Sequence, residues 1–208
     1  MSGYKYLFGP VPSRRLGASL GVSPIPERTC NYSCVYCQLG RTLRMTNTRQ
    51  EFFPLEEILA EFREYLRGSI PFDVVTVVGE GEPTLYSRLG ELIAGLKKET
   101  DKPVAVITNG ALLYDAEMRR ELMEADIVLP SLDAVTEEQY RKIDRPMGSI
   151  GFAEMAEGLR QFAREYQGQL WIEIMLVDGM NDSPEDIAAF KEFLGTIDYD
   201  RVYLKTPV

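Results

Sequence analysis

Three cysteines, Cys30, Cys34 and Cys37, lie within eight residues of a 208-residue chain that has no other cysteine and no histidine. Their spacing, C-x-x-x-C-x-x-C, suits three thiolates around one iron–sulfur cube. A 4Fe-4S cluster normally takes four protein thiolates, so three leave one iron without a protein ligand. An open coordination position is where a metal centre binds a reactant, as in catalytic zinc sites. The spacing therefore predicts cluster chemistry rather than cluster storage.

Other roles suit these cysteines less well. Buried structural cysteines would not all gather on one loop flanked by proline and arginine. Disulfides are disfavoured by the odd count and by the N-terminus, MSGYKYLFGPVPSRR, which lacks an apolar secretory core and indicates a cytoplasmic protein. A zinc site would need a fourth ligand from Asp, Glu or water. Two alternatives stay open: a non-catalytic iron–sulfur electron carrier and a zinc-stabilised binding module.

The charge of the chain is unevenly distributed. The net charge is −9, which argues against general affinity for nucleic acid. Residues 1–50 nevertheless carry a net +6, so the remaining residues carry −15. This basic block predicts either a solvated surface or a rim beside the cysteine loop for an anionic group, such as a carboxylate, a phosphate or a redox partner.

Length and hydropathy predict one domain, residues 1–208, with no membrane span, because the longest apolar runs are only strand-sized. Short β-rich runs alternate with amphipathic segments, which predicts βα units and a parallel sheet. Thr136 with Gln139 and Ser183 with Asp186 have the spacing of helix-capping pairs. The expected strands are 18–22, 74–78, 104–108, 127–132, 170–177 and 202–204. The expected helices cover 55–66, 89–96, 118–122, the segment from the capping start at 136 to 166, and 184–194.

Side-chain alternation along these strands separates two faces of the sheet. One polar face near the carboxyl ends and one apolar face predict an α/β partial (β/α)6 TIM-like barrel with its site at those ends, where the cysteine loop also lies. The chain stops soon after the sixth strand, so we expect either a natural end or a missing C-terminal piece. The residues assigned to the polar inner face are Thr76, Glu80, Thr108, Ser131, Asp133 and Glu173, and those assigned to the apolar outer face are Val75, Val77, Ile107, Leu132, Ile172 and Ile174.

The run GEGEPT, residues 79–84, follows the second expected strand. It fits a dinucleotide fingerprint poorly, because Thr84 takes the place of the third glycine and Glu80 and Glu82 would repel a pyrophosphate. Two carboxylates and two glycines instead suit a cationic ligand, such as an ammonium group held by Glu82. The alternative is a pair of surface ion pairs at a turn.

Taken together, these motifs resemble those of the radical S-adenosylmethionine (radical SAM) superfamily. The cysteines with Tyr36 look like its cluster motif, and Gly81-Glu82-Pro83 resembles its GGEP motif, with Glu80 replacing the first glycine. The resemblance spans nearly the whole chain. The opening, FGPVPSRRLGASLGV followed by CVYCQLGRT, looks closest to a little-characterised branch grouped near wyosine-base synthases.

The resemblance implies that the three cysteines hold three irons and that the amine and carboxylate of S-adenosylmethionine (SAM) bind the fourth. One electron from the cluster would then cleave the sulfonium to methionine and a 5′-deoxyadenosyl radical, which abstracts a hydrogen atom from the substrate. The implied cofactor-binding residues are Tyr36 near the adenine, Gly81 and Glu82 at the ammonium, Thr108 and Asn109 after the third strand, Ser131 or Asp133 at the ribose or carboxylate, Arg145 at the carboxylate, and Asn181 and Leu204 in backbone segments beside the adenine.

With every cysteine committed to one cluster, no cysteine can hold an auxiliary cluster or carry a methyl group. This weighs against wyosine synthases and rRNA methyl synthases, and it leaves glycyl-radical activases, small-molecule isomerising or ring-modifying enzymes, and modifiers of protein or RNA. The resemblance implies an electron donor of the flavodoxin or ferredoxin type. A wide barrel mouth and the basic block predict an anionic or macromolecular substrate, such as a protein, a peptide or RNA. Glu173 is a candidate substrate contact, or else an internal ion pair with Lys205 or an arginine.

Overall fold

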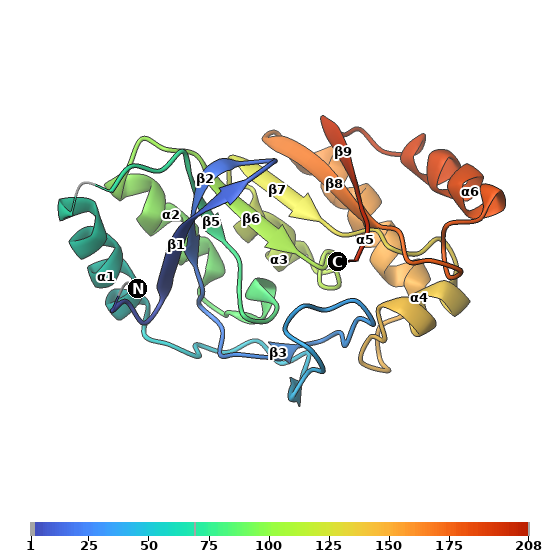
Figure 1. Ribbon diagram of the computed structural model, residues 1–208, viewed down its shortest axis with the longest axis horizontal. Coiled ribbons are helices and arrows are strands. Elements are labelled where there is room, and N and C mark those ends of the chain that lie inside the picture. The colour runs from blue at the N-terminus through green and yellow to red at the C-terminus, as the bar shows by residue number, and fades with distance from the viewer. Residues whose placement is uncertain (1–2, 69, 208) are drawn as a thin grey trace.

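A curled seven-stranded sheet organises the computed structural model, which describes residues 3–68 and 70–207 (Figure 1). Six neighbouring strands are parallel, and only the first is antiparallel to its neighbour. The predicted partial barrel of parallel strands is therefore confirmed. The strands, in spatial order, are β1 (Leu7–Ser13), β2 (Gly17–Val22), β5 (Val74–Val77), β6 (Val104–Thr108), β7 (Ile127–Pro130), β8 (Gln169–Met175) and β9 (Arg201–Lys205).

The helices follow the apolar spacing of the sequence. In α1, Leu55, Ile58, Leu59 and Phe62 are buried at intervals of three and four residues, behind Pro54. The Ser183–Asp186 capping box opens α6, as the sequence predicts. The other helices are α2 (Leu89–Glu99), α3 (Ala116–Leu122), α4 (Glu137–Ile143) and α5 (Phe152–Glu165), while α1 covers Leu55–Arg67, α6 covers Pro184–Leu194, and a single 3₁₀ turn, η1, covers Pro83–Leu85.

The two faces of the sheet differ in what covers them. One face packs its aliphatic residues against the helices in the main core. The other face carries a smaller apolar cluster that contains no helix residue, and its buried polar side chains include Thr76 and Asp133 toward the carboxyl ends of the strands. The members of this inner cluster are Leu16, Val74, Ala105, Ile127, Leu129 and Trp171, with Ile107 and Tyr203 packed against them.

The predicted faces of Ile107 and Thr108 are wrong. The register pairs Thr76 with Ala105 and Ile107 with Leu129, so Ile107 shares the inner face with Thr76. Thr108 therefore belongs to the opposite parity, at the very end of β6. The Thr108 side chain is buried there because its hydroxyl donates to Glu82 on a neighbouring loop. The polarity of Thr108 therefore did not indicate which face of the sheet it occupies.

Strand β1 was not predicted. Pro10 and Pro12 make its sequence read as a loop, but β1 is the edge of the sheet, where missing N–H groups are tolerated. The region from Thr136 to Tyr166 forms two helices, because Asp144 to Gly151 interrupt it. The expectation about the chain end concerns Val208, which lies outside the described residues. No helix among the described residues is long and apolar enough to cross a membrane.

The cysteine segment lies at the carboxyl ends of the parallel strands. In Figure 1 it forms the blue loop below the sheet, on the side toward which the arrows of β6 and β7 point. Its ends are tied by a short parallel pair, β3 (Thr29–Cys30) with β4 (Arg44–Met45). The sheet thus presents its polar ends to the three thiols.

Candidate active site

Tight turns fix the three cysteines within their loop. The N–H of Cys37 donates to the carbonyl of Cys34 at 3.2 Å, and the N–H of Gly40 donates to the carbonyl of Cys37 at 2.9 Å. All three thiols are free and half-buried. They border a common cavity of about 80 Å³, whose wall also includes Gly81.

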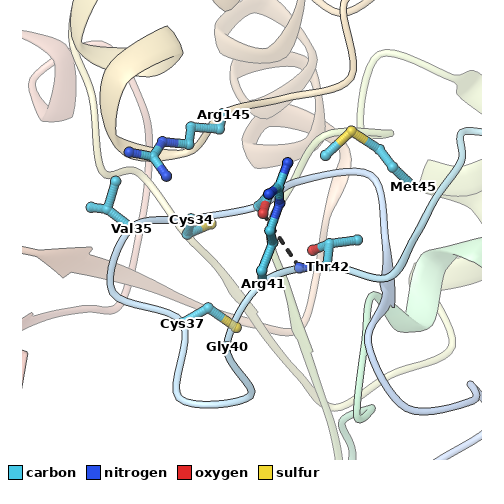
Figure 2. A pocket seen from close by; sticks show the side chains of 9 residues that line it. Cys34, Val35, Cys37, Gly40, Arg41, Thr42, Met45 and Arg145 are labelled. Carbon is cyan, nitrogen blue, oxygen red and sulfur yellow. Dashed lines mark hydrogen bonds between the residues drawn. The ribbon is translucent and has the colours of Figure 1, made fainter.

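A larger cavity of about 660 Å³ lies on another side of the same loop. Cys34 and Cys37 form part of its wall, and Arg41 and Arg145 also line it (Figure 2). Arg145 adopts a left-handed backbone conformation with φ of 50°, which is unusual for a residue other than glycine. Its carbonyl accepts the N–H of Ser33 at 3.3 Å, so the strained turn holds the guanidinium beside the cysteine loop.

The thiols fit an iron–sulfur cluster better than a single metal ion. No three His, Cys, Asp or Glu side chains of the described residues converge on one ion-sized point, whereas the three sulfurs do surround a shared cavity. Burial raises the pKa of Cys30 to about 12 and raises the pKa of Cys34 well above its usual value. Both are therefore neutral thiols in the metal-free protein. Bound iron would supply the positive charge that favours thiolates, so loading must release protons.

Glycine is required at position 81. A Cβ there would overlap the carbonyl oxygen of Thr29, just before Cys30, and would lie 2.8 Å from a methyl group of Ile25. The next residue confirms this close approach, because the N–H of Glu82 donates to the same Thr29 carbonyl at 3.0 Å. The loop that follows β5 is thus in direct contact with the cysteine segment at Thr29.

Glu82 is the central acceptor of the site, with 3% of its surface exposed. Its Oε1 accepts from the N–H and hydroxyl of Thr84 at 3.0 and 2.7 Å and from the Thr108 hydroxyl at 2.6 Å. Its Oε2 accepts only the N–H of Asn109, at 2.8 Å. Burial raises the pKa of Glu82, and these hydrogen bonds oppose that rise. Glu80, by contrast, is exposed, so only one carboxylate of GEGEPT enters the site.

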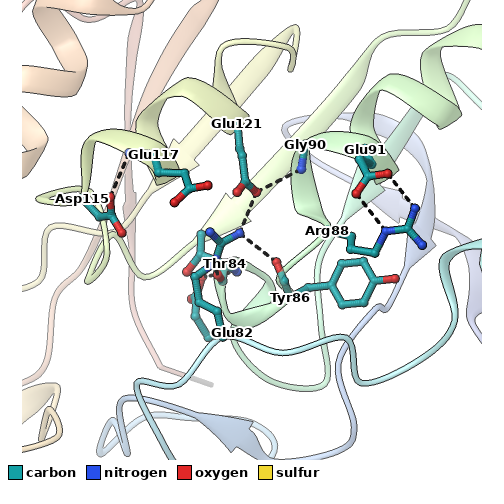
Figure 3. A network of polar contacts seen from close by, with 10 residues as sticks. Glu82, Thr84, Tyr86, Arg88, Gly90, Glu91, Asp115, Glu117 and Glu121 are labelled. Atoms are coloured by element: carbon teal, nitrogen blue, oxygen red, sulfur yellow. Dashed lines mark hydrogen bonds and ion pairs between the residues drawn. The ribbon is translucent and has the colours of Figure 1, made fainter.

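Arg49 holds the turn that carries Glu82 through hydrogen bonds to residues other than Glu82. Arg49 donates to the carbonyls of Thr84 and Tyr86, both at 3.0 Å, and to the carboxylate of Glu121 at 2.6 Å. Figure 3 shows Glu82 and Thr84 beside this network. The hydrogen-bond donors to Glu82 are all neutral, and no ion pair within 4.0 Å among residues 3–68 and 70–207 includes its carboxylate.

A second buried carboxylate, Asp133, joins the cysteine loop to β8. The Tyr36 hydroxyl donates to one Asp133 oxygen, and the N–H of Met175 donates to the other at 2.6 Å. Burial raises the pKa of Asp133 to about 6. Asn181 joins the backbone of Asp133 to the end of β8. Its amide donates to the carbonyls of Asp133 and Met175, both at 2.8 Å, and it is fully buried. The Asn181 side chain is thus committed to structure.

Glu173 forms an internal ion pair, which was one of its two predicted roles. It lies beside Ser131 in a parallel bridge, on the inner face of the sheet. Its carboxylate pairs with Lys205 at 2.8 Å and with Arg15, which reaches it from the turn between β1 and β2. Leu204 points elsewhere: it is 63% exposed and lines an apolar cavity of about 300 Å³ beside α6, and it does not line either cavity that contains cysteines.

Two residues that sequence reasoning missed also contact the cysteines. Asp144 is buried with an oxygen 3.8 Å from the Cys34 sulfur, and Asn31 is fully buried next to Cys30. The position of Asn31 directly after the first cysteine was a local signal for it. Asp144 had no such signal, because 110 residues separate it from Cys34.

Comparison with known proteins supports this geometry. Residues 25–191 match the family model described as "Radical SAM superfamily". The chain is 44% identical over 202 residues to a Brachyspira hyodysenteriae protein named GTPase Obg, covering 97% of this chain and 30% of that protein. It is 38% identical over 202 residues to a UPF0026 protein of Synechocystis, covering 97% of this chain and 75% of that protein.

The fold also matches solved structures. Native anSMEcpe with bound AdoMet superposes with a TM-score of 0.67 at 17% identity, over 91% of this chain and 51% of that one. At this identity the likeness supports the fold alone. The sequence match over residues 25–191 carries the family assignment, and it includes the three cysteines, Glu82 and the ends of the strands that surround them. The chain belongs to the radical SAM superfamily, among its UPF0026 members.

Proposed function

We propose that this chain uses a 4Fe-4S cluster to cleave SAM reductively, and that the resulting 5′-deoxyadenosyl radical abstracts a hydrogen atom from a substrate. The observation that carries this proposal is the shared cavity of Cys30, Cys34, Cys37 and Gly81 at the carboxyl ends of a partial barrel. Cys30, Cys34 and Cys37 would hold the cluster, which when bound would supply the electron that breaks the sulfonium bond and leave one iron open to SAM.

The residues of the chain would bind and orient SAM. The Glu82 carboxyl group has only neutral donors, and its Oε2 accepts a single N–H, so its carboxylate form suits the ammonium of SAM. Arg145, on the wall of the larger cavity, suits the carboxylate. Tyr36, Ser131 and Asp133 stand between the cysteine loop and β8, where the adenosyl part would lie. The segments of Asn181 and Leu204 would contribute backbone contacts only.

Anaerobic reconstitution tests the proposal. Iron and sulfide are measured per chain, and 5′-deoxyadenosine is then measured after SAM and dithionite are added. We expect about four irons and four sulfides and formation of 5′-deoxyadenosine. Cys34→Ala should abolish both cluster and product. Zinc without sulfide, or a full cluster that never cleaves SAM, would contradict the proposal.

The substrate is proposed to be anionic or macromolecular. The net charge of +6 on residues 1–50 supports an anionic substrate, and Glu173 is neutralised by Arg15 and Lys205. We propose that the chain belongs to the branch near wyosine-base synthases on its opening sequence alone, since the relatives above do not carry that name.

Pull-down of radiolabelled RNA and of peptides by the reconstituted protein tests which class of macromolecule is the substrate. Retention of neither class would remove the macromolecular part of this proposal.

An acidic protein of the flavodoxin or ferredoxin type is proposed to deliver the electron. Residues 28–50 contain no acidic residue, and Arg41 and Arg44 are exposed beside Leu43, which is 70% exposed. Such a surface suits a negatively charged partner. Reduction of the cluster by flavodoxin should slow with rising salt and in the Arg44→Gln variant, whereas reduction by dithionite should not. Equal loss with both reductants would contradict this docking surface.

A further inference from the structure

Asn31 is a fully buried amide whose donor has no partner. Its side chain is 0% exposed, yet its Nδ2 finds no hydrogen-bond acceptor among the described residues. A buried unpaired donor costs free energy, so native structures seldom keep one without a reason. An acceptor is therefore expected at this position in the working protein.

The orientation of this amide is fixed by its neighbours. The backbone N–H of Ala111 can only donate, and it donates to Oδ1 of Asn109 at 2.9 Å. This turns Nδ2 of Asn109 toward Asn31, whose Oδ1 accepts it at 2.7 Å. Rotating the Asn31 amide by half a turn would bring two NH₂ groups face to face. The free group on Asn31 is consequently its donor and not its acceptor.

The unpaired donor lies next to the first cysteine. The Cys30 thiol donates to Oδ1 of Asn31 at 4.0 Å, and the free Nδ2 is bonded to the same carbon as this oxygen. Two N–H groups donate to the Cys30 sulfur, from the Asn109 amide at 3.6 Å and from the Tyr32 backbone at 3.3 Å. These two donors suit a sulfur that carries negative charge, as it does when it binds iron.

We propose that Asn31 donates its free N–H to a sulfur of the bound cluster and thereby raises the reduction potential of that cluster, with Asn109 as the residue that orients it. This rests on the proposed function, because it requires that the cluster is present. Reduction adds negative charge to the sulfurs, and a hydrogen bond to them stabilises the reduced form more than the oxidised form. Asn31 is thus a positioning residue for the electron and touches no substrate.

The test measures the midpoint potential of the cluster by EPR-monitored titration without SAM. Iron and sulfide are counted first, so failure of the proposed function shows as a wild-type protein without a cluster. In Asn31→Leu we expect reduction to become about tenfold less favourable, which is a shift of about 59 mV to lower potential for a one-electron couple. Asn47→Leu is the matched control, because its amide donates to Ser149 at 2.8 Å and has no recorded cysteine contact.

A second variant guards against misassembly. Asn31→Asp keeps the shape of the side chain and the acceptor for Asn109 but replaces the free donor, and Asn47→Asp reports the effect of an added charge. A drop in potential for Asn31→Asp supports the proposal only together with a drop for Asn31→Leu, because a carboxylate beside Cys30 lowers the potential by its charge alone. An unchanged potential in the Asn31 variants overturns the proposal. This holds even if SAM binds these variants more weakly, because the Asn31 donor would then bind SAM and not a sulfur of the cluster. Failure of both Asn31 variants to hold a cluster counts against it too, since a tuning donor is not needed for assembly.

Discussion

Glu82 and Glu173 are both carboxylates near the carboxyl ends of the barrel strands, and they are satisfied in opposite ways. Glu82 is buried among four neutral donors, two of them backbone N–H groups, and forms no ion pair within the part of the chain that the structure describes. Glu173 is flanked by two cations, Arg15 and Lys205. Hydrogen bonds from neutral groups hold a carboxylate in place but leave its charge available, whereas ion pairs consume that charge. Only Glu82 therefore suits recognition of a cationic ligand.

The largest expected difference between the two carboxylates is in stability. Glu82→Ala leaves the N–H groups of Thr84 and Asn109 buried and unpaired, which should lower the free energy of unfolding by about 3–5 kcal/mol. Glu173→Ala should cost about 1–2 kcal/mol, because Lys205 is partly exposed and can be rehydrated. Urea denaturation of the metal-free proteins measures both. Equal losses would show that Glu82 is not the structural centre of the site.

The next prediction compares how the charge of Glu82 and the charge of Glu173 affect SAM affinity. Glu82→Gln keeps the shape of the side chain and removes its charge, so SAM should bind about 10- to 150-fold more weakly, equivalent to about 1.5–3 kcal/mol. Glu173→Gln, the matched control, should change SAM affinity less than about twofold. Equilibrium dialysis of the cluster-loaded proteins under anaerobic conditions gives both constants. Similar weakening in the two variants would contradict the division of roles.

A smaller effect concerns Asp133, which is intermediate between the two because it has two donors and the Lys205 charge nearby. Its pKa of about 6 lies above the unfolded value of about 4, so the folded state binds more protons between these pH values. The stability of the metal-free protein should therefore fall as pH rises from about 4 to 6.

Asp144 shifts in the same direction, through burial and the Asp133 charge. Asp133→Asn can still accept the Met175 N–H and can donate its NH₂ to the Tyr36 hydroxyl, so this variant should flatten the pH dependence without abolishing it. The midpoint of urea unfolding, followed at half-unit pH steps, checks this. An unchanged slope in the variant would assign the pH dependence to Asp144 or to other groups.

The smallest effect is expected at Leu204. Its side chain is 63% exposed beside α6, so Leu204→Ala should change stability by less than about 0.5 kcal/mol and leave SAM affinity unaltered. Thermal unfolding and the same dialysis assay test both. A clear loss of SAM binding would restore a direct role for this side chain.

Local patterns predicted most of the fold. The apolar spacing of α1 and the capping box of α6 place those helices within about one residue of their observed starts. The face of Ile107 was misassigned because it depends on the register between β5 and β6, which no local pattern encodes. The edge strand β1 was missed because its prolines are tolerated only where no neighbour follows.

In the candidate site too, residues in local motifs were predicted and their distant partners were not. Cys30, Cys34, Cys37 and Glu82 lie in short motifs, and their place follows from spacing and residue type. The partners that hold them come from far along the chain: Asp144 reaches Cys34 across 110 residues, and Asn109 reaches Asn31 across 78. Such long-range contacts are fixed by tertiary packing, so one sequence read alone could not supply them.

This distance has a consequence for synthesis of the protein. Cys34 leaves the ribosome long before Asp144 does, and at about 5–20 residues per second the delay is roughly 5–20 seconds. The segments that form β5 and the Glu82 turn are made early in that interval, and Asp144 is the last of these partners to be made. The complete site, with Asp144 beside Cys34, therefore forms only after the later half of the chain has emerged, so binding of the proposed cluster to that complete site follows its synthesis.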